Sequence, residues 1–159
     1  MRLPVLVLAL ASLSPAPLPG PGAVIDMHVR LFAALDAGDS EAAQAFLTGS
    51  PYFGLFLVDG EGRPAKATSL QEGKDLLARL AGEAKKAGGT WRTAIVSDKA
   101  ECTSPEFGFA TLEFRREHTV DGKTVARTWR STSLGNYRAG QWRLFHWHVS
   151  PGEAVAAPR

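Results

Sequence analysis

The chain has 159 residues, 45% of them hydrophobic, which is enough for one domain with a core of its own and too short for two. Its 18 Lys and Arg nearly balance 16 Asp and Glu, and one basic residue, Arg2, lies in a separate leader, so the charge gives no reason to expect a nucleic-acid partner. The single cysteine, Cys102, excludes an internal disulfide, and the hydrophobic core must therefore hold the fold alone.

The leader, MRLPVLVLALASLSPAPLPGPGA, differs in kind from the rest of the chain. One Arg precedes an apolar run from Leu3 to Leu13, which is about half the length needed to span a bilayer. This order of regions is typical of a secretory signal peptide. We therefore predict a signal peptide over 1–22, with a cleavage point that the crowded prolines leave undefined, a domain over 23–152 and a disordered tail over 153–159. The mature protein is expected to be exported, to the periplasm or the medium, with no membrane partner.

Three helices are predicted first. AVIDMHVRLFAALDAG has the spacing of an amphipathic helix, with Ile25, Val29, Phe32 and Leu35 on one stripe. DSEAAQAFL predicts a short helix capped by its first Asp, and SLQEGKDLLARLAGEAKKAG predicts a third helix that begins with a Ser-x-x-Glu capping box. YFGLFLV, between the second and third helices, reads as a strand, and four further strands follow from Trp91 onward. This order predicts an α+β domain with an antiparallel sheet.

Two hairpins fix the register of that sheet. The Asp-Gly pair at 121–122 is a strong hairpin signal. It sets Phe114, Leu112 and Ala110 opposite Trp129, Ser131 and Ser133. A three-residue loop around Gly140 then sets Val149, Trp147 and Phe145 beside Ser131, Ser133 and Gly135. The first pairing also brings Glu113 opposite Arg130, and this match of opposite charges supports the register.

One face of the predicted sheet is apolar and has small residues in its middle. Glycines within strands mark bulges or strong curvature, and a curved sheet roofed by the first helix would enclose a pocket. The same small residues also suit close helix packing, which would leave no pocket. The predicted ligand-binding residues are Phe32, Ala110, Leu112, Phe114, Trp129, Ser131, Ser133, Trp147 and Val149, with Arg116 and Arg127 at the hairpin end.

The other face carries the two histidines of WRLFHWHVSP. His146 and His148 share a face because side chains alternate along a strand. They lack an evident third ligand for zinc, so no metal site is predicted. We expect them to take part in a homodimer contact through the outer sheet face, because a large apolar patch is uncommon on a monomer. The predicted interface residues are Phe109, Leu134, Trp142, Leu144, His146 and His148.

Catalytic candidates are few. Acid–base enzymes bury a carboxylate in the pocket, where desolvation tunes its pKa, and the predicted inner rungs hold none. His28, at the border of the first helix's apolar stripe, is the best single candidate, although a buried histidine that only makes structural hydrogen bonds is an alternative. His118 and Tyr137 are the others. His118 clusters with Arg116 and Arg127, either as a cationic rim or as a solvated strand end.

Two stretches, LFAALDAGDSEAAQAFL and NYRAGQWRLFHWHVSP, resemble the opening helix pair and the closing hairpin of the nuclear transport factor 2-like superfamily, in its SnoaL-like branch. The closing hairpin is also similar to the association domain of calcium/calmodulin-dependent kinase II. The resemblance implies a cone-shaped α+β barrel, in which a curved antiparallel sheet packs on three N-terminal helices, usually as a dimer. The superfamily contains isomerases, dehydratases, binding modules and oligomerisation hubs, so the fold does not decide the function.

The residues and the resemblance together lead to one expectation with two alternatives. We expect an exported small-molecule-binding or accessory domain with a mainly apolar pocket, a small apolar ligand and no cofactor. The first alternative is a SnoaL-like isomerase or lyase that uses His28, or His118 with Tyr137. The second is a dimerisation or assembly module with a collapsed pocket. Whether the protein is an enzyme stays open at this point.

Overall fold

The computed structural model describes residues 19–59 and 62–152. Within them the elements, in chain order, are α1 (Pro21–Asp36), α2 (Ser40–Gln44), β1 (Gly54–Val58), β2 (Pro64–Ala67), α3 (Leu70–Lys86), β3 (Thr90–Ser104), β4 (Phe107–Val120), β5 (Lys123–Arg138) and β6 (Gln141–Pro151). Most of the predicted signal peptide and all of the predicted tail lie outside the described residues. No helix in the described ranges is long and apolar enough to cross a membrane.

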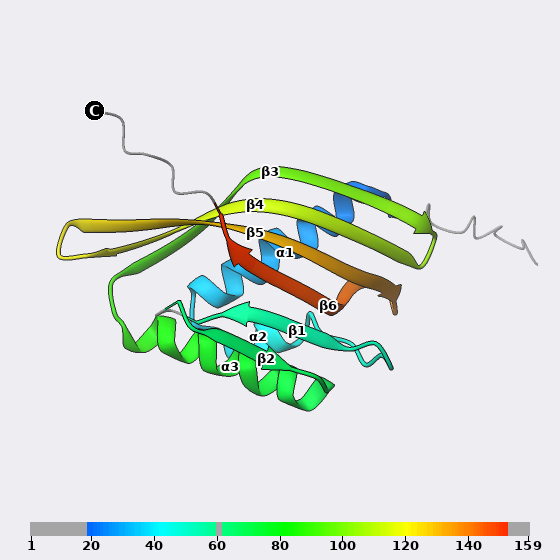
Figure 1. Cartoon of the computed structure of the whole chain (residues 1–159), viewed down its shortest axis with the longest axis horizontal. Coiled ribbons are helices and arrows are strands. Elements are labelled where there is room, and N and C mark those ends of the chain that lie inside the picture. The colour runs from blue at the N-terminus through cyan, green and yellow to red at the C-terminus, as the bar shows by residue number, and fades with distance from the viewer. Residues whose placement is uncertain (1–18, 60–61, 153–159) are drawn as a thin grey trace, which may run out of the picture.

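The described strands form one six-stranded sheet in the order β2-β1-β6-β5-β4-β3. All neighbours run antiparallel except β1 and β6, which pair in parallel, so the sheet is mixed rather than wholly antiparallel. Figure 1 shows α1 lying across one face of β3–β6, with α3 beside β2. The α+β fold class is confirmed as a curved, open sheet. Strand β2 was not predicted, because its sequence, Pro-Ala-Lys-Ala, carries no strand signal.

Helix starts agree with their sequence signals. The Asp39 carboxylate accepts a hydrogen bond from the Ala42 N–H, as an N-cap should. The Ser69 hydroxyl accepts from the Glu72 N–H, and the Glu72 carboxylate accepts in return from the Ser69 N–H. These bonds satisfy donors that the first turn of a helix leaves unpaired. Both predicted caps are confirmed.

The β4–β5 register is as predicted. Phe114 pairs with Trp129, Leu112 with Ser131 and Ala110 with Ser133. The hairpin turns through Asp121 and Gly122 at φ angles of 50° and 74°, the positive values that a two-residue hairpin loop requires at both positions. This hairpin extends beyond the other strands (Figure 1).

The β5–β6 register differs from the predicted one in two ways, and beyond the second difference the two cancel. The loop at Ala139 and Gly140 has two residues rather than three, and a bulge between Leu134 and Gly135 adds the missing residue back. The predicted pairs Ser131–Val149 and Ser133–Trp147 are therefore correct. The predicted pair Gly135–Phe145 is wrong, because Leu144 takes that place.

The bulge changes which side chains face the core. Trp142 and Leu144, predicted on the outer face, are instead 2% and 0% exposed and belong to the hydrophobic core. Phe145 is also buried, at 6% exposure, and its ring packs against Phe107 with ring centroids 5.9 Å apart. A bulge places two residues opposite one, so every side chain between it and the turn moves to the other face.

Helix α1 buries a stripe that differs from the predicted one. Val24, Met27, Leu31 and Phe32 are buried, whereas Val29 is 50% exposed. The buried positions follow the spacing of three and four residues that keeps side chains on one helix face. Val29 lies off this stripe, and its place in the prediction was wrong.

Candidate functional site

A cavity of about 250 Å³ lies at the hairpin end of the sheet, between the strands and helices α1 and α3. Its wall is mainly apolar and contains five aromatic side chains, Phe32, Trp91, Phe114, Trp129 and Trp147. Arg116, His118, Arg127, Asp59 and Thr93 supply the polar side chains. A mostly apolar wall with a few polar groups is the usual make-up of a small-molecule site.

The predicted pocket residues divide into a group that lines the cavity and a group that does not. Phe32, Phe114, Trp129, Trp147 and Val149 line it, together with Arg116 and Arg127. Four others do not line it. Ser133 lies against His28 of α1, close to Ala110, whereas Leu112 and Ser131 border a separate surface hollow. Ala110 and Ser133 are 0% and 1% exposed. In the middle of the sheet the small residues let helix α1 pack closely and leave no pocket, which is the alternative given in the sequence analysis.

His28 is part of this filled middle. Its ring is fully buried, with Nδ1 2.9 Å from the Val24 carbonyl oxygen and Nε2 2.9 Å from the Ser133 hydroxyl. Burial lowers the pKa of His28 from 6.5 to about 4, so the ring is neutral at pH 7. A carbonyl can only accept, so Nδ1 donates to Val24 and Nε2 accepts from the hydroxyl of Ser133.

This arrangement removes His28 from the list of catalytic candidates at the cavity. The side chain does not line the cavity, and the rings of Phe32 and Trp147 each lie 6.4 Å from it, centroid to centroid. Both of its nitrogens have protein partners. His28 therefore holds α1 against β5.

His118 and Tyr137, proposed as partners from the sequence, are not brought together. His118 lines the cavity, whereas Tyr137 lies at a separate surface hollow and packs against Trp142. The pairing of these two side chains for catalysis is therefore wrong.

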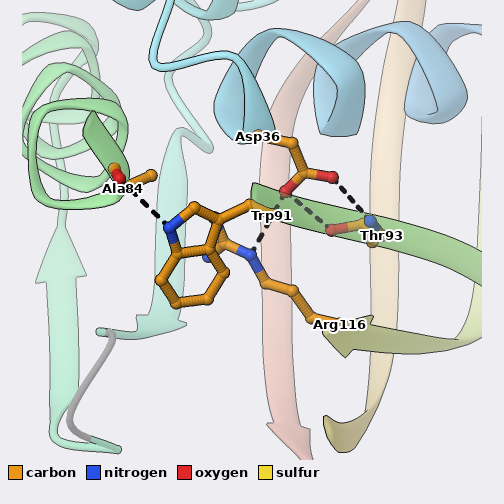
Figure 2. Close-up of polar contacts among 5 residues, drawn as sticks. All are labelled: Asp36, Ala84, Trp91, Thr93 and Arg116. Atoms are coloured by element: carbon orange, nitrogen blue, oxygen red, sulfur yellow. Dashed lines mark hydrogen bonds and ion pairs between the residues drawn. The ribbon is translucent and has the colours of Figure 1, made fainter. Parts of the chain in front are cut away.

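A stack of three side chains forms the polar end of the cavity. The rings of Trp91 and His118 are parallel within 4° and 3.9 Å apart, and the guanidinium carbon of Arg116 lies 4.4 Å from the Trp91 ring centroid. Trp91 donates its indole N–H to the Ala84 carbonyl of α3 at 3.0 Å (Figure 2). His118 Nε2 donates to the Gly88 carbonyl at 2.9 Å. These bonds fix the stack to the end of α3.

Asp36, at the last turn of α1, supports the same end. Its carboxylate accepts from the Thr93 N–H at 2.6 Å and from the Thr93 hydroxyl at 2.9 Å, and lies 3.3 Å from Arg116 Nε (Figure 2). The carboxylate thus ties α1 to β3 and β4 at once. Sequence reasoning missed Asp36, Thr93 and Trp91, because their meeting depends on how α1 crosses the sheet.

Asp59 is a second residue that sequence reasoning missed. It is 5% exposed, lines the cavity and accepts from the backbone N–H and from Nε of Arg63, both at 2.9 Å. Its sequence context, Val-Asp-Gly-Glu-Gly-Arg-Pro, indicates only a turn. The burial of Asp59 follows from the pairing of β1 with β6, which carries the end of β1 to the cavity.

The outer face of the sheet keeps part of the predicted interface. His146 and His148 lie beside the exposed ring of Phe56 on β1, at centroid distances of 5.7 and 6.5 Å. Phe109 and Leu134 are half-buried there. Trp142 and Leu144 are core residues and do not reach this face. Within the described ranges, no three His, Cys, Asp or Glu side chains gather in a way that could hold a metal ion.

Comparisons with known proteins place this geometry in a known fold. No family model and no curated protein matches the sequence. Solved structures do match, at low sequence identity. A candidate dehydratase of the nuclear transport factor 2-like family from Streptomyces avermitilis is 14% identical, with a TM-score of 0.67 over 84% of this chain and 97% of that one.

Two further neighbours belong to different groups. A nuclear transport factor 2-like protein with a cystatin-like fold from Novosphingobium aromaticivorans is 15% identical, with a TM-score of 0.65 over 85% of this chain and 83% of that one. The calcium/calmodulin-dependent kinase II hub of S. rosetta is 17% identical, with a TM-score of 0.61 over 86% of this chain and 100% of that one. The chain therefore has the nuclear transport factor 2-like fold, and the predicted resemblance is confirmed at that level.

Proposed function

We propose that this domain is exported and binds a small, mainly apolar molecule in the cavity at the hairpin end, as a binding or accessory protein. The observation that carries the proposal is the cavity of about 250 Å³ walled by five aromatic rings. Pockets for drug-sized molecules span roughly 300–1,000 Å³. A cavity just below that range suits a compact ligand that is smaller than most drug molecules. Export rests on the apolar leader alone.

The polar groups at the cavity support binding more than acid–base chemistry. Asp59 is hydrogen-bonded to Arg63, and His118 Nε2 to the Gly88 carbonyl. A general base must reach the proton it removes and must be free to accept it. Asp59 has an arginine partner, which makes its carboxylate a weaker base, whereas the bond to Gly88 occupies one nitrogen of His118 and leaves Nδ1 as the ring atom that can accept a proton. His28, the strongest candidate from the sequence, lies outside the cavity wall.

Titration with a neutral apolar dye, N-phenylnaphthylamine, tests this function. We expect saturable fluorescence enhancement with the wild type. Val149→Phe places a ring in the cavity wall and should weaken dye binding at least ten-fold. Val96→Phe is the matched control, because Val96 is 60% exposed on β3 and does not line the cavity. Equal uptake by the two variants would place the dye elsewhere and remove the support for the proposal.

Assembly is a second candidate function, favoured by the structural likeness to the S. rosetta hub. The exposed Phe56 and the neighbouring His146 and His148 would supply the contact on the outer face. Light scattering should give a dimer mass at micromolar concentration, and His148→Asp should shift it toward the monomer. A monomeric wild type would overturn this candidate. Leu144→Asp is unsuitable as a probe, because Leu144 is a core residue.

A further inference from the structure

Arg116 is a charged group at the cavity whose hydrogen-bonding capacity is mostly unused. Its side chain is 22% exposed, and its nearest acid, Asp36, contacts only Nε at 3.3 Å. The Nη2 atom is buried and has no hydrogen-bond partner among the described residues. Burial lowers the pKa of Arg116 and the charge of Asp36 raises it, and an arginine stays protonated under such conditions. A buried charged donor without an acceptor is unfavourable.

Trp147 presents a second unused donor in the same wall. Its side chain lines the cavity, and its indole Nε1 is buried without a hydrogen-bond partner among the described residues. Buried tryptophan N–H groups usually find an acceptor. Arginine and tryptophan side chains donate hydrogen bonds and cannot accept them. A ligand group that pairs with either residue must therefore be an acceptor, such as an oxygen.

We infer that the ligand of this cavity is a small organic carboxylate, whose apolar body lies among the aromatic rings and whose oxygens accept from Arg116. The inference rests on the proposed binding function and names its ligand class. A carboxylate has two acceptor oxygens and forms charge-assisted hydrogen bonds, which are stronger than bonds to a neutral oxygen.

The nearby acids do not cancel this preference, because each is engaged. Asp36 takes both donors of Thr93 as well as Arg116, and Asp59 is bonded to Arg63. Glu83 on α3 acts on Arg116 only through its charge. Arg127, exposed at the cavity mouth, adds a further positive charge. The charges around the cavity are thus nearly balanced, and selection of an anion depends on short hydrogen bonds rather than on a long-range field.

The guanidinium is also held in place before a ligand arrives. Trp91 stacks against it and is fixed by its bond to Ala84, while Asp36 is fixed by Thr93 (Figure 2). A donor held in this way loses little conformational entropy when it binds an anion. Asp36 and Trp91 are positioning residues in this account.

The test compares an acid with its alcohol. Hydrocinnamate and hydrocinnamyl alcohol share one ring and one chain, and differ in the charged head. We expect hydrocinnamate to bind the wild type at least ten-fold more tightly by calorimetry, and to displace N-phenylnaphthylamine at correspondingly lower concentration. Equal affinity for acid and alcohol would overturn the inference, as would the absence of any heat with hydrocinnamate. Dye binding without acid preference would leave the proposed function standing and remove only its ligand class.

Variants locate the preference. Arg116→Met should abolish the acid preference while dye binding persists. Arg115→Met is the matched control, because Arg115 is exposed on the same strand and does not line the cavity. Arg116→Lys keeps the charge and should retain part of the preference, and it serves if Arg116→Met fails to fold by circular dichroism. A full acid preference in either Arg116→Met or a folded Arg116→Ala would overturn the inference.

Discussion

The middle and the hairpin end of the inner sheet face differ in how they are filled. In the middle, Ala110 and Ser133 are small, and α1 lies so close that both are almost fully buried. At the hairpin end, flat rings such as Trp91 and Trp129 stand between the sheet and the helices, and a cavity remains. Small side chains let a helix approach, whereas large rings hold elements apart. A pocket is therefore not found where the sheet has its smallest residues.

The largest expected effect comes from overfilling the middle. Ser133→Phe should lower the free energy of unfolding by at least about 3 kcal/mol, because the ring has no space and His28 Nε2 loses its only described donor. Chemical denaturation followed by circular dichroism measures this loss. A loss below about 1 kcal/mol would mean that the middle of the face is not closely packed.

The second effect is a dependence on pH. His28 has a folded-state pKa of about 4 against an ordinary value of 6.5, so the unfolded chain binds this proton more readily. The free energy of unfolding should therefore fall as the pH drops from about 6.5 to 4, by up to about 3 kcal/mol from this residue. Above pH 7 the histidine is neutral in both states, so it does not change the free energy of unfolding with pH.

Urea denaturation at several pH values checks this slope. His28→Gln keeps hydrogen-bonding capacity and removes the titration, so the variant should show a smaller change over the same window. The difference between the two proteins isolates His28 from the carboxylates that also titrate there. Parallel curves for both proteins would contradict the buried, neutral state of the ring.

The sequence predicted features that lie within one helix or hairpin better than the contacts between separate elements. The Asp-Gly hairpin and the two helix caps depend on neighbours in the chain, and all three were correct. The predicted β5–β6 turn has one residue too many. The bulge between Leu134 and Gly135 restores the predicted register for the pairs farther from the turn. Side chains on the near side of the bulge, Trp142 and Leu144, are consequently predicted on the wrong face. Gly135 lies at that bulge and is the kind of residue that marks one, but a glycine does not show how many residues the facing strand inserts.

The same difference between local features and contacts between elements applies to the candidate site. The register correctly predicted some of its strand residues, such as Phe114, Trp129 and Val149, but it also predicted residues in the middle of the sheet that do not line the cavity. Asp36 and Asp59 were missed because they reach the site through tertiary packing, of α1 on β3 in the one case and of β1 on β6 in the other. Periodicity within one element contains no information on such crossings.

A smaller loss of stability is expected when a hydrogen bond at the hairpin end is removed. Thr93→Val removes one hydrogen bond to Asp36 at nearly constant shape and should lower the free energy of unfolding by about 1 kcal/mol. Thr132→Val is the control, since Thr132 is exposed on the outer face, and it should change stability by less than about 0.5 kcal/mol. Thermal or urea denaturation compares the two. Equal effects would show that Asp36 does not hold β3 through this hydroxyl.

The smallest expected effect is that of Val149→Phe on stability. The substitution introduces the same ring as Ser133→Phe on the adjoining strand, where Val149 pairs with Ser131. Here the ring has a cavity of about 250 Å³ beside it, so it can be accommodated without displacing α1. Added apolar burial offsets the lost rotamer freedom, and the free energy of unfolding should stay within about 0.5 kcal/mol of the wild type. Denaturation of the two Phe variants side by side measures the contrast directly. If Val149→Phe destabilises the protein as much as Ser133→Phe does, the hairpin end is filled like the middle, and a ligand cavity there is excluded.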